Sequence, residues 1–182
     1  MRAVCVHMTR NVAALNHIQM ERVAVGFTQS RGCDEFGTFA SLTPLRFEKG
    51  SLTTIRKGKL YTMQRFLDEN GVEYLYLLKF FLPRFLNMNF QDKMTTLVHE
   101  LLHISEAFDG DIRRFEGRCY AHSSSQKDFD KYASQLASLW LAKRPPEELY
   151  AFLRDDCNTL IAKHGGLYGK HFSAPKLIRV NS

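Results

Sequence analysis

The sequence predicts one α+β domain over residues 1–182, with an antiparallel sheet packed against helices and a metal site on a central helix. Three observations support this prediction. Strand-like segments lie between Met20 and Phe81, and an Asn-Gly pair falls between the last two of them. An uninterrupted amphipathic helix pattern then runs from Asn89 to Ala107 and carries the sequence His-Glu-x-x-His.

The first half of the chain begins with helical spacing over residues 3–18 and continues with strands. Alternation of Val23, Val25 and Phe27 predicts a half-buried strand near residues 20–28, followed by a loop to Gly37. Strand character resumes over 38–47, where Pro44 indicates an edge or a bulge. A turn at 48–51 leads to a short strand over 52–56.

The next two strand candidates cover residues 59–67 and 72–81, on either side of Asn70-Gly71. Asn-Gly is a strong hairpin signal because both residues tolerate positive φ. The second strand is nearly all apolar, so we expect it to be covered on both faces. The sequence leaves open which strand forms the free edge of the sheet.

The helix from Asn89 has candidate caps in Asn87 and Asn89, and Asp92 places a negative charge in the first turn. At about 100° per residue, its apolar side chains fall on one sector. These are Met94, Leu97, Val98, Leu101, Leu102 and Ile104. His99 and His103 fall on the opposite side, with Glu100 at the border, so we expect one face to pack on the core and the other to face a cleft.

This spacing predicts a zinc site, although two ordinary histidines on a helix are the simpler interpretation of such a short pattern. His99 and His103 lie one turn apart, where two imidazoles can bind one Zn²⁺ at roughly 2.0–2.1 Å. Glu100 is then placed to take a proton from metal-bound water, whose pKa zinc lowers to about 7. Glu100 is the predicted catalytic residue.

A catalytic zinc usually has a third protein ligand, and two residues compete for this role. Asp109 lies ten residues after His99, as in metzincin-type sites, but Glu106 stands where those sites have glycine. We therefore expect the helix to continue past Glu106 and carry Asp109 away. His122 is favoured because imidazole suits zinc and because a helix follows it.

Other polar residues near this loop have candidate supporting roles. Tyr120 and Arg113 are candidates for stabilising an oxyanion, and Asp109 is a candidate for orienting a metal-bound histidine. The remaining chain predicts a helix at about 125–142, with Phe129, Tyr132, Leu136, Leu139 and Trp140 buried. A further helix is expected at about 146–163, followed by an irregular basic tail over 164–182.

Composition restricts the class of protein. The charged fraction of 24% excludes a disordered chain, and no apolar run approaches the ~18 residues of a membrane span. The beginning of the chain does not resemble a secretory signal, and four scattered cysteines do not indicate a disulfide framework, so a cytoplasmic location is expected. The net charge of +6 and a pI of about 9.2 allow weak, salt-sensitive contact with nucleic acid.

Several motifs together resemble a known family. They are Pro83-Arg84-Phe85, the segment Thr96–Ile104, Phe108-Asp109-Gly110 and Arg118-x-Tyr120-Ala121-His122. This set resembles the metallopeptidase domain of phage-type and bacterial proteins, and His122 before a helix is similar to SprT-like zinc proteases. The resemblance covers about Ala3 to Leu160. The chain departs from SprT-like proteins because Ser123 replaces the glycine after the third histidine and because a zinc ribbon is lacking.

The resemblance implies a small gluzincin-like or SprT-like zincin fold that hydrolyses peptides or proteins. It implies His99, His103 and His122 as Zn²⁺ ligands and Glu100 as general base. The alternative from another class is a non-catalytic, zinc-stabilised module associated with DNA, which the basic pI favours. Glu100 favours the enzyme, because a structural zinc site needs no base.

Overall fold

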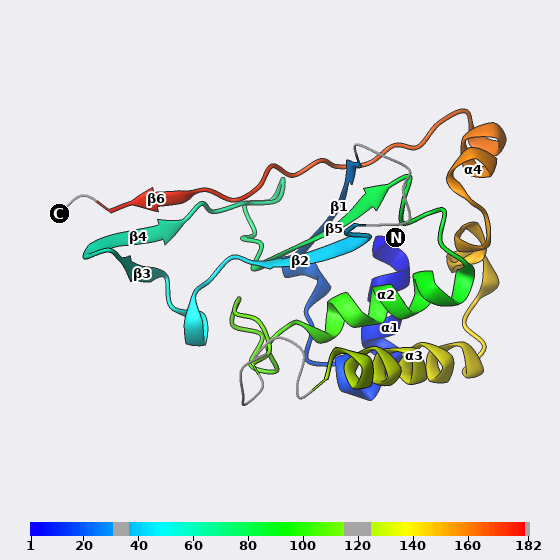
Figure 1. Cartoon of the computed structure of the whole chain (residues 1–182), viewed down its shortest axis with the longest axis horizontal. Coiled ribbons are helices and arrows are strands. Elements are labelled where there is room, and N and C mark those ends of the chain that lie inside the picture. The colour runs from blue at the N-terminus through cyan, green and yellow to red at the C-terminus, as the bar shows by residue number, and fades with distance from the viewer. Residues whose placement is uncertain (31–36, 115–124, 181–182) are drawn as a thin grey trace.

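The computed structural model describes residues 1–30, 37–114 and 125–180, which form a mixed α and β structure (Figure 1). The α-helices are α1 (Arg2–Asn11), α2 (Phe90–Leu102), α3 (Gln126–Ala142) and α4 (Cys157–His164). The strands are β1 (Val23–Gln29), β2 (Ala40–Pro44), β3 (Thr53–Arg56), β4 (Lys59–Met63), β5 (Tyr76–Leu82) and β6 (Leu177–Arg179). Short 3₁₀ helices are η1 (Ala13–Leu15), η2 (Met20–Arg22), η3 (Glu48–Gly50), η4 (Glu147–Leu149) and η5 (Ala151–Arg154).

The strands form two sheets, which we call sheet A, with the order β1-β5-β2, and sheet B, with the order β3-β4-β6. Sheet B is antiparallel, and β2 also runs antiparallel to β5. β1 instead runs parallel to β5, with Val23 opposite Tyr76, so the expected fully antiparallel sheet is only partly correct. Strand β5 occupies the centre of sheet A because it is the one with apolar residues on both faces.

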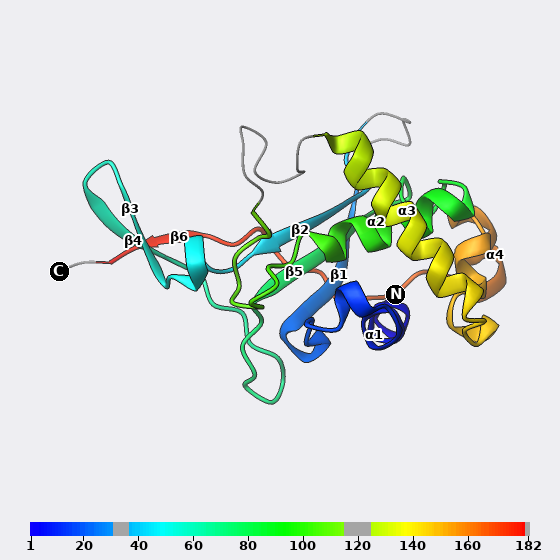
Figure 2. The ribbon, with the colours of Figure 1, turned by 90° about the horizontal axis from the view of Figure 1, so that it is seen from below.

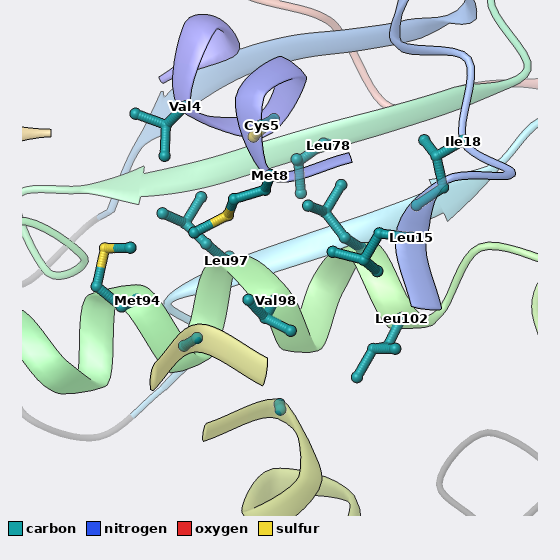
Figure 3. Close-up of a cluster of buried hydrophobic side chains, with 14 of the residues drawn as sticks. Val4, Cys5, Met8, Leu15, Ile18, Leu78, Met94, Leu97, Val98 and Leu102 are labelled. Atoms are coloured by element: carbon teal, nitrogen blue, oxygen red, sulfur yellow. The ribbon is translucent and has the colours of Figure 1, made fainter. Parts of the chain in front are cut away.

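The helices α1, α2 and α3 lie on one side of sheet A (Figures 1 and 2). Tyr76, Leu78 and Phe80 of β5 join the helices in the main core, and Figure 3 shows Leu78 near side chains of α1 and α2. Leu77 faces the other way and packs in a smaller cluster with Tyr74. The prediction that this strand is covered on both faces is therefore confirmed.

Helix α2 begins and packs as its sequence predicts. Asn89 is the N-cap, and its side chain accepts a hydrogen bond of 2.9 Å from the backbone N–H of Asp92. The six predicted apolar residues, Met94, Leu97, Val98, Leu101, Leu102 and Ile104, are all fully buried. Their burial against α1 and sheet A fixes which face of α2 carries His99 and His103.

The end of α2 differs from the prediction, because the helix stops at Leu102 and does not continue past Glu106. Tertiary hydrogen bonds compete for the backbone here. The carbonyl of His103 accepts from the N–H of Arg113 at 2.7 Å, and Ile104 forms an antiparallel bridge with Ile112. The Tyr76 hydroxyl accepts from the Gly110 N–H and donates to the Asp111 carbonyl, both at 2.9 Å, which anchors the loop on β5.

The predicted hairpin at Asn70-Gly71 is correct only locally. Leu67 and Glu73 form a bridge around the turn, but the flanking strands enter different sheets. β4 pairs instead with β3, across a turn in which Lys57 and Gly58 have φ values of 51° and 71°. The Asn70-Gly71 pair therefore determines only the local reversal of the chain. The apolar residues of β5 determine that this strand belongs to sheet A.

The first helix is shorter than predicted, since α1 ends at Asn11 and η1 follows. The Asn11 side chain donates a hydrogen bond of 2.9 Å to the carbonyl of His7 and so competes with the helical backbone. Helix α3 closely matches its prediction, with Ser125 as N-cap, and buries Phe129 and Trp140. Tyr132 and Leu139 are exposed, contrary to the prediction.

The region after α3 also departs from the prediction. A helix over 146–163 is replaced by η4, η5 and α4, with Asp156 capping α4. The buried ammonium of Lys93 binds the carbonyls of Leu153 and Asp155, which holds the chain in its turn before α4. The tail is not irregular throughout, because β6 pairs with β4. Among the described residues, no helix has the length and apolarity needed to cross a membrane.

Candidate functional site

His99 and His103 converge on the outward face of α2. Their Nε2 atoms lie 3.0 Å apart, and their ring centroids are separated by 4.8 Å. Two nitrogens bound tetrahedrally to one zinc ion at 2.0–2.1 Å would be roughly 3.3 Å apart. The two Nε2 atoms are thus in direct hydrogen-bond contact, at a separation close to that of two ligands of one zinc ion.

Asp130 at the start of α3 orients the first histidine. Its Oδ1 lies 2.6 Å from Nδ1 of His99. A carboxylate only accepts hydrogen bonds, so the proton of neutral His99 resides on Nδ1 and its Nε2 presents a lone pair. Metal-binding histidines commonly have such a carboxylate partner, which fixes the tautomer and raises the basicity of the ligand.

Phe129, the neighbour of Asp130, contacts both imidazoles. Its ring lies edge-on to His99 at a centroid distance of 4.9 Å and stacks on His103 at 5.1 Å with an angle of 22°. Phe129 is itself buried at the contact between α2 and α3. The first turn of α3 thus restricts the rings of both histidines.

The side chain of Glu100 extends from α2 toward the edge of sheet A, and the residue is 8% exposed. Burial raises the pKa of Glu100 to about 7, although a hydrogen bond from the backbone N–H of Leu42 opposes the shift. A carboxyl group with a pKa near neutrality can both accept and release a proton under physiological conditions. Its position beside the two histidines gives the site a candidate acid–base group.

A groove of about 400 Å³ runs along this face of α2. It is lined by the segment Gly37 to Ala40, which leads into β2, and by His99 and Glu100, whereas His103 does not line it. Gln126 and Asp130 of α3 line the groove as well. The site is therefore open to a ligand between the edge strand and the two helices.

The structure also resolves which strand forms the edge beside the helix. β2 pairs on one side with β5, and its Leu42 N–H points to Glu100 on the other side. The opposite edge of sheet A, β1, is partly occupied because the Phe27 N–H donates to the carbonyl of Lys170. Pro44 lies in β2, as expected for an edge strand.

The remaining predicted site residues are placed as follows. The Asp109 Oδ1 accepts a hydrogen bond of 3.1 Å from the N–H of Asp111. Arg113 forms an ion pair of 3.3 Å with Glu106. His122 and Tyr120, the candidate third ligand and oxyanion group, lie outside the described residues, so their predicted roles stay predictions.

The described segments, residues 1–30, 37–114 and 125–180, contain only part of a zinc site. Within them, no group of three His, Cys, Asp or Glu side chains comes together to bind a metal. Asp109 accordingly does not join His99 and His103 there. The histidine pair itself fits zinc, because the two Nε2 atoms lie 3.0 Å apart and one ring has a carboxylate partner.

Asp130 is the residue that the sequence interpretation missed. A weak signal was present, because Asp130 follows Phe129, which was expected on the inner face of its helix. At about 100° from Phe129, its side chain falls on the flank of that face. Pairing with His99 across 31 positions of sequence depends on how α3 docks on α2, which helical spacing alone does not specify.

Comparisons of the chain with models of protein families, with curated proteins and with solved structures find no match. The geometry of the described residues is thus the basis for assigning a function.

Proposed function

We propose that the protein is a zinc-dependent metallopeptidase with a zincin-like fold. The convergence of the His99 and His103 Nε2 atoms at 3.0 Å, with the buried Glu100 carboxyl beside them, is the observation that carries this proposal. In the proposal, His99, His103 and His122 hold the zinc ion. Zinc bound there would supply a Lewis acid and a water of lowered pKa.

The residues of the chain have distinct roles in this proposal. Glu100 accepts the proton of the attacking water and passes it to the leaving amine, which a carboxylate beside the metal can do. Asp130 keeps the Nδ1 proton of His99 in place and leaves Nε2 directed toward His103. Phe129 restrains both rings and excludes water from one side of the site.

The substrate class follows from the position of β2. An extended peptide can add to a strand edge through main-chain hydrogen bonds, and β2 borders the groove that contains His99 and Glu100, with its Leu42 N–H already bonded to Glu100. A peptide bound there would run past the acid–base group. We therefore favour hydrolysis of an extended peptide or of an unfolded protein segment.

The test combines metal content with proteolysis by the full chain. We expect the purified protein to retain about one zinc ion per chain and to cleave unfolded, fluorescently labelled casein, and we expect a chelator to abolish cleavage. Glu100→Gln should keep zinc and fold but lower the cleavage rate by at least about 100-fold, since it removes the base and leaves the ligands.

Glu48→Gln is the matched control, because Glu48 is an exposed glutamate outside the helix that carries the site. It should retain both zinc and cleavage. Equal cleavage by wild type and Glu100→Gln would refute the mechanism. A protein that binds zinc tightly without cleaving any substrate would instead favour the alternative, a non-catalytic zinc-stabilised module.

A further inference from the structure

Sheet B lies at one end of the molecule and α4 at the other (Figures 1 and 2). The helices that cover sheet A do not reach it. Its segments, residues 52–63 and 176–180, contain five cationic residues and no acidic residue. The cations are Arg56, Lys57, Lys59, Lys176 and Arg179, and all five are exposed. Pairing of β6 with β4 brings together charges that lie more than a hundred positions apart in the sequence.

These five charges form a local excess of positive charge. The net charge of the whole protein is +6, so all other residues together contribute only +1. Within the described part of the chain, none of the five forms an ion pair with a carboxylate. A concentrated and uncompensated positive charge of this kind attracts a polyanion.

The strand register separates the side chains of sheet B into two faces. Residues directly opposite each other in neighbouring strands point to the same face. Arg56 is opposite Lys59, and Tyr61 is opposite both Thr54 and Arg179. Arg56, Lys59, Tyr61 and Arg179 therefore share one face, which we call the cationic face.

The other face of sheet B is apolar and also exposed. It carries Ile55, Leu60, Ile178 and Val180, of which Ile55 is 72% exposed. Because these four apolar side chains and the cations Arg56, Lys59 and Arg179 occupy opposite faces, a flat bilayer that buried the first would have these three cations directed away from its headgroups. A nucleic acid backbone requires only the cationic face, so the geometry favours nucleic acid over a membrane.

Tyr61 indicates the form of nucleic acid. It lies on β4, the central strand of sheet B, with Lys59 two residues away on the same face and Arg179 opposite. Tyr61 is partly exposed, and a partly exposed aromatic ring among exposed cations provides a surface on which an unpaired base stacks while nearby cations neutralise phosphates. Bases of a duplex are already stacked on each other and are not available for such a contact.

We propose that the cationic face of sheet B, with Tyr61 at its centre, binds single-stranded nucleic acid. The interaction is independent of sequence, since it combines base stacking with phosphate neutralisation. It requires neither zinc nor peptidase activity, so this proposal does not depend on the proposed function of the groove.

The experiment measures binding of the full chain to a fluorescently labelled oligothymidylate by anisotropy. A length of roughly 20 nucleotides exceeds the site of about 4–16 nucleotides that one small domain covers. Tyr61→Thr keeps a residue suited to a strand but removes the ring, and should weaken binding roughly 5- to 150-fold. Tyr61→Phe keeps the ring and should retain wild-type affinity.

The charge contribution is tested by a pair of double variants. Lys59→Gln with Arg179→Gln should weaken binding and lower the slope of log K against log salt by about 1.4, or 0.7 for each lost phosphate contact. The control, Lys127→Gln with Lys131→Gln, removes the same charge from exposed positions on α3 and should have little effect. Equal losses for both double variants would overturn the assignment to sheet B.

Three further results would contradict the proposal. They are the absence of oligothymidylate binding at low salt, tighter binding to a duplex of the same length, and binding only to phosphatidylserine vesicles. Ultraviolet cross-linking of wild-type protein to the oligonucleotide provides a test without substitutions. The cross-linked peptide should contain Tyr61, and cross-links confined to other parts of the chain would refute the site even if a variant failed to fold.

Discussion

Nδ1 of His99 lies 2.6 Å from Oδ1 of Asp130, which connects α2 to the N-terminal part of α3 at the candidate metal site. The His99 side chain is 15% exposed, whereas that of Asp130 is 46% exposed. Solvent around Asp130 weakens the contribution of this pair to stability. Its main effect is therefore on the orientation and basicity of the imidazole.

Asp130→Asn should consequently reduce zinc affinity roughly 10- to 100-fold, the usual effect of removing the partner of a metal-bound histidine. The thermal midpoint of the metal-free protein should change little. A competition titration with a chromogenic zinc chelator measures the affinity. Asp128→Asn, two residues earlier and exposed, should leave zinc binding unchanged. Identical affinities for Asp130→Asn and wild type would exclude an orienting role for Asp130.

Lys93 of α2 makes a second long-range contact, which stabilises the segment before α4. Its side chain is 1% exposed, and Nζ donates to the carbonyls of Leu153 at 3.0 Å and Asp155 at 2.7 Å. Lys93→Met would leave these acceptors without their partner, at a net cost of about 1–3 kcal/mol once the relief of burying a charge is included. Urea denaturation measures the loss, and Lys131→Met, at an exposed position, should cost much less. An unchanged midpoint for Lys93→Met would show that the carbonyls find other partners.

The Asp111 carboxyl makes the stability of the folded protein depend on pH in the acid range. Burial raises the pKa of its carboxyl, but hydrogen bonds from Arg114 and from the backbone N–H groups of Lys49 and Ile112 outweigh burial, so the pKa is lower than its ordinary value of 3.8. A pKa lowered by folding stabilises the protein above the unfolded value. That stabilisation is lost as the pH falls through the folded-state pKa.

Asp111→Asn should therefore destabilise the protein at pH 7 by about 1.5–3 kcal/mol, the value of a hydrogen bond to a charged group. The difference from wild type should shrink below about pH 4, where the wild-type carboxylate also becomes protonated. Free energies of unfolding in urea from neutral to acid pH measure this trend. Glu48→Gln, an exposed carboxyl nearby, should have no comparable effect. A difference between Asp111→Asn and wild type that grows in acid would contradict the sign of the shift.

The sequence predicted best what depends on local periodicity. The apolar sector of α2, its Asn89 cap and the convergence of His99 and His103 all follow from the helical repeat and from side-chain chemistry. The α+β class followed for the same reason. These features needed no knowledge of distant contacts.

Features determined by long-range contacts were not predicted correctly. Helix α2 has no glycine or proline at its end, yet it stops where Arg113 binds the carbonyl of His103 and Tyr76 anchors the next loop. Long-range pairing also places the strands on either side of Asn70-Gly71 in different sheets. It likewise brings together in sheet B charges that are far apart in the sequence. Each of these outcomes depends on which segments pair in space.

The third zinc ligand is a prediction that the described residues leave to experiment. Helix α2 does not run past Glu106, so this argument for His122 as the third ligand is lost. Two other observations argue against Asp109. Its Oδ1 accepts from the N–H of Asp111, and its Cβ lies against the backbone of Gly50, where an added Cβ would be only 3.0 Å away. These contacts hold Asp109 in the turn beside η3.

His122→Ala should therefore lower zinc affinity far more than Asp109→Asn does. Asp109→Asn should reduce it by at most the 10- to 100-fold of a residue that acts through another ligand. Zinc stoichiometry and competition titrations on both variants measure the difference, with His171→Ala as a control at an exposed histidine. Imidazole is the better zinc ligand, and loss of one of three protein ligands removes a metal bond outright. Full zinc retention by His122→Ala, together with loss in Asp109→Asn, would reverse the assignment.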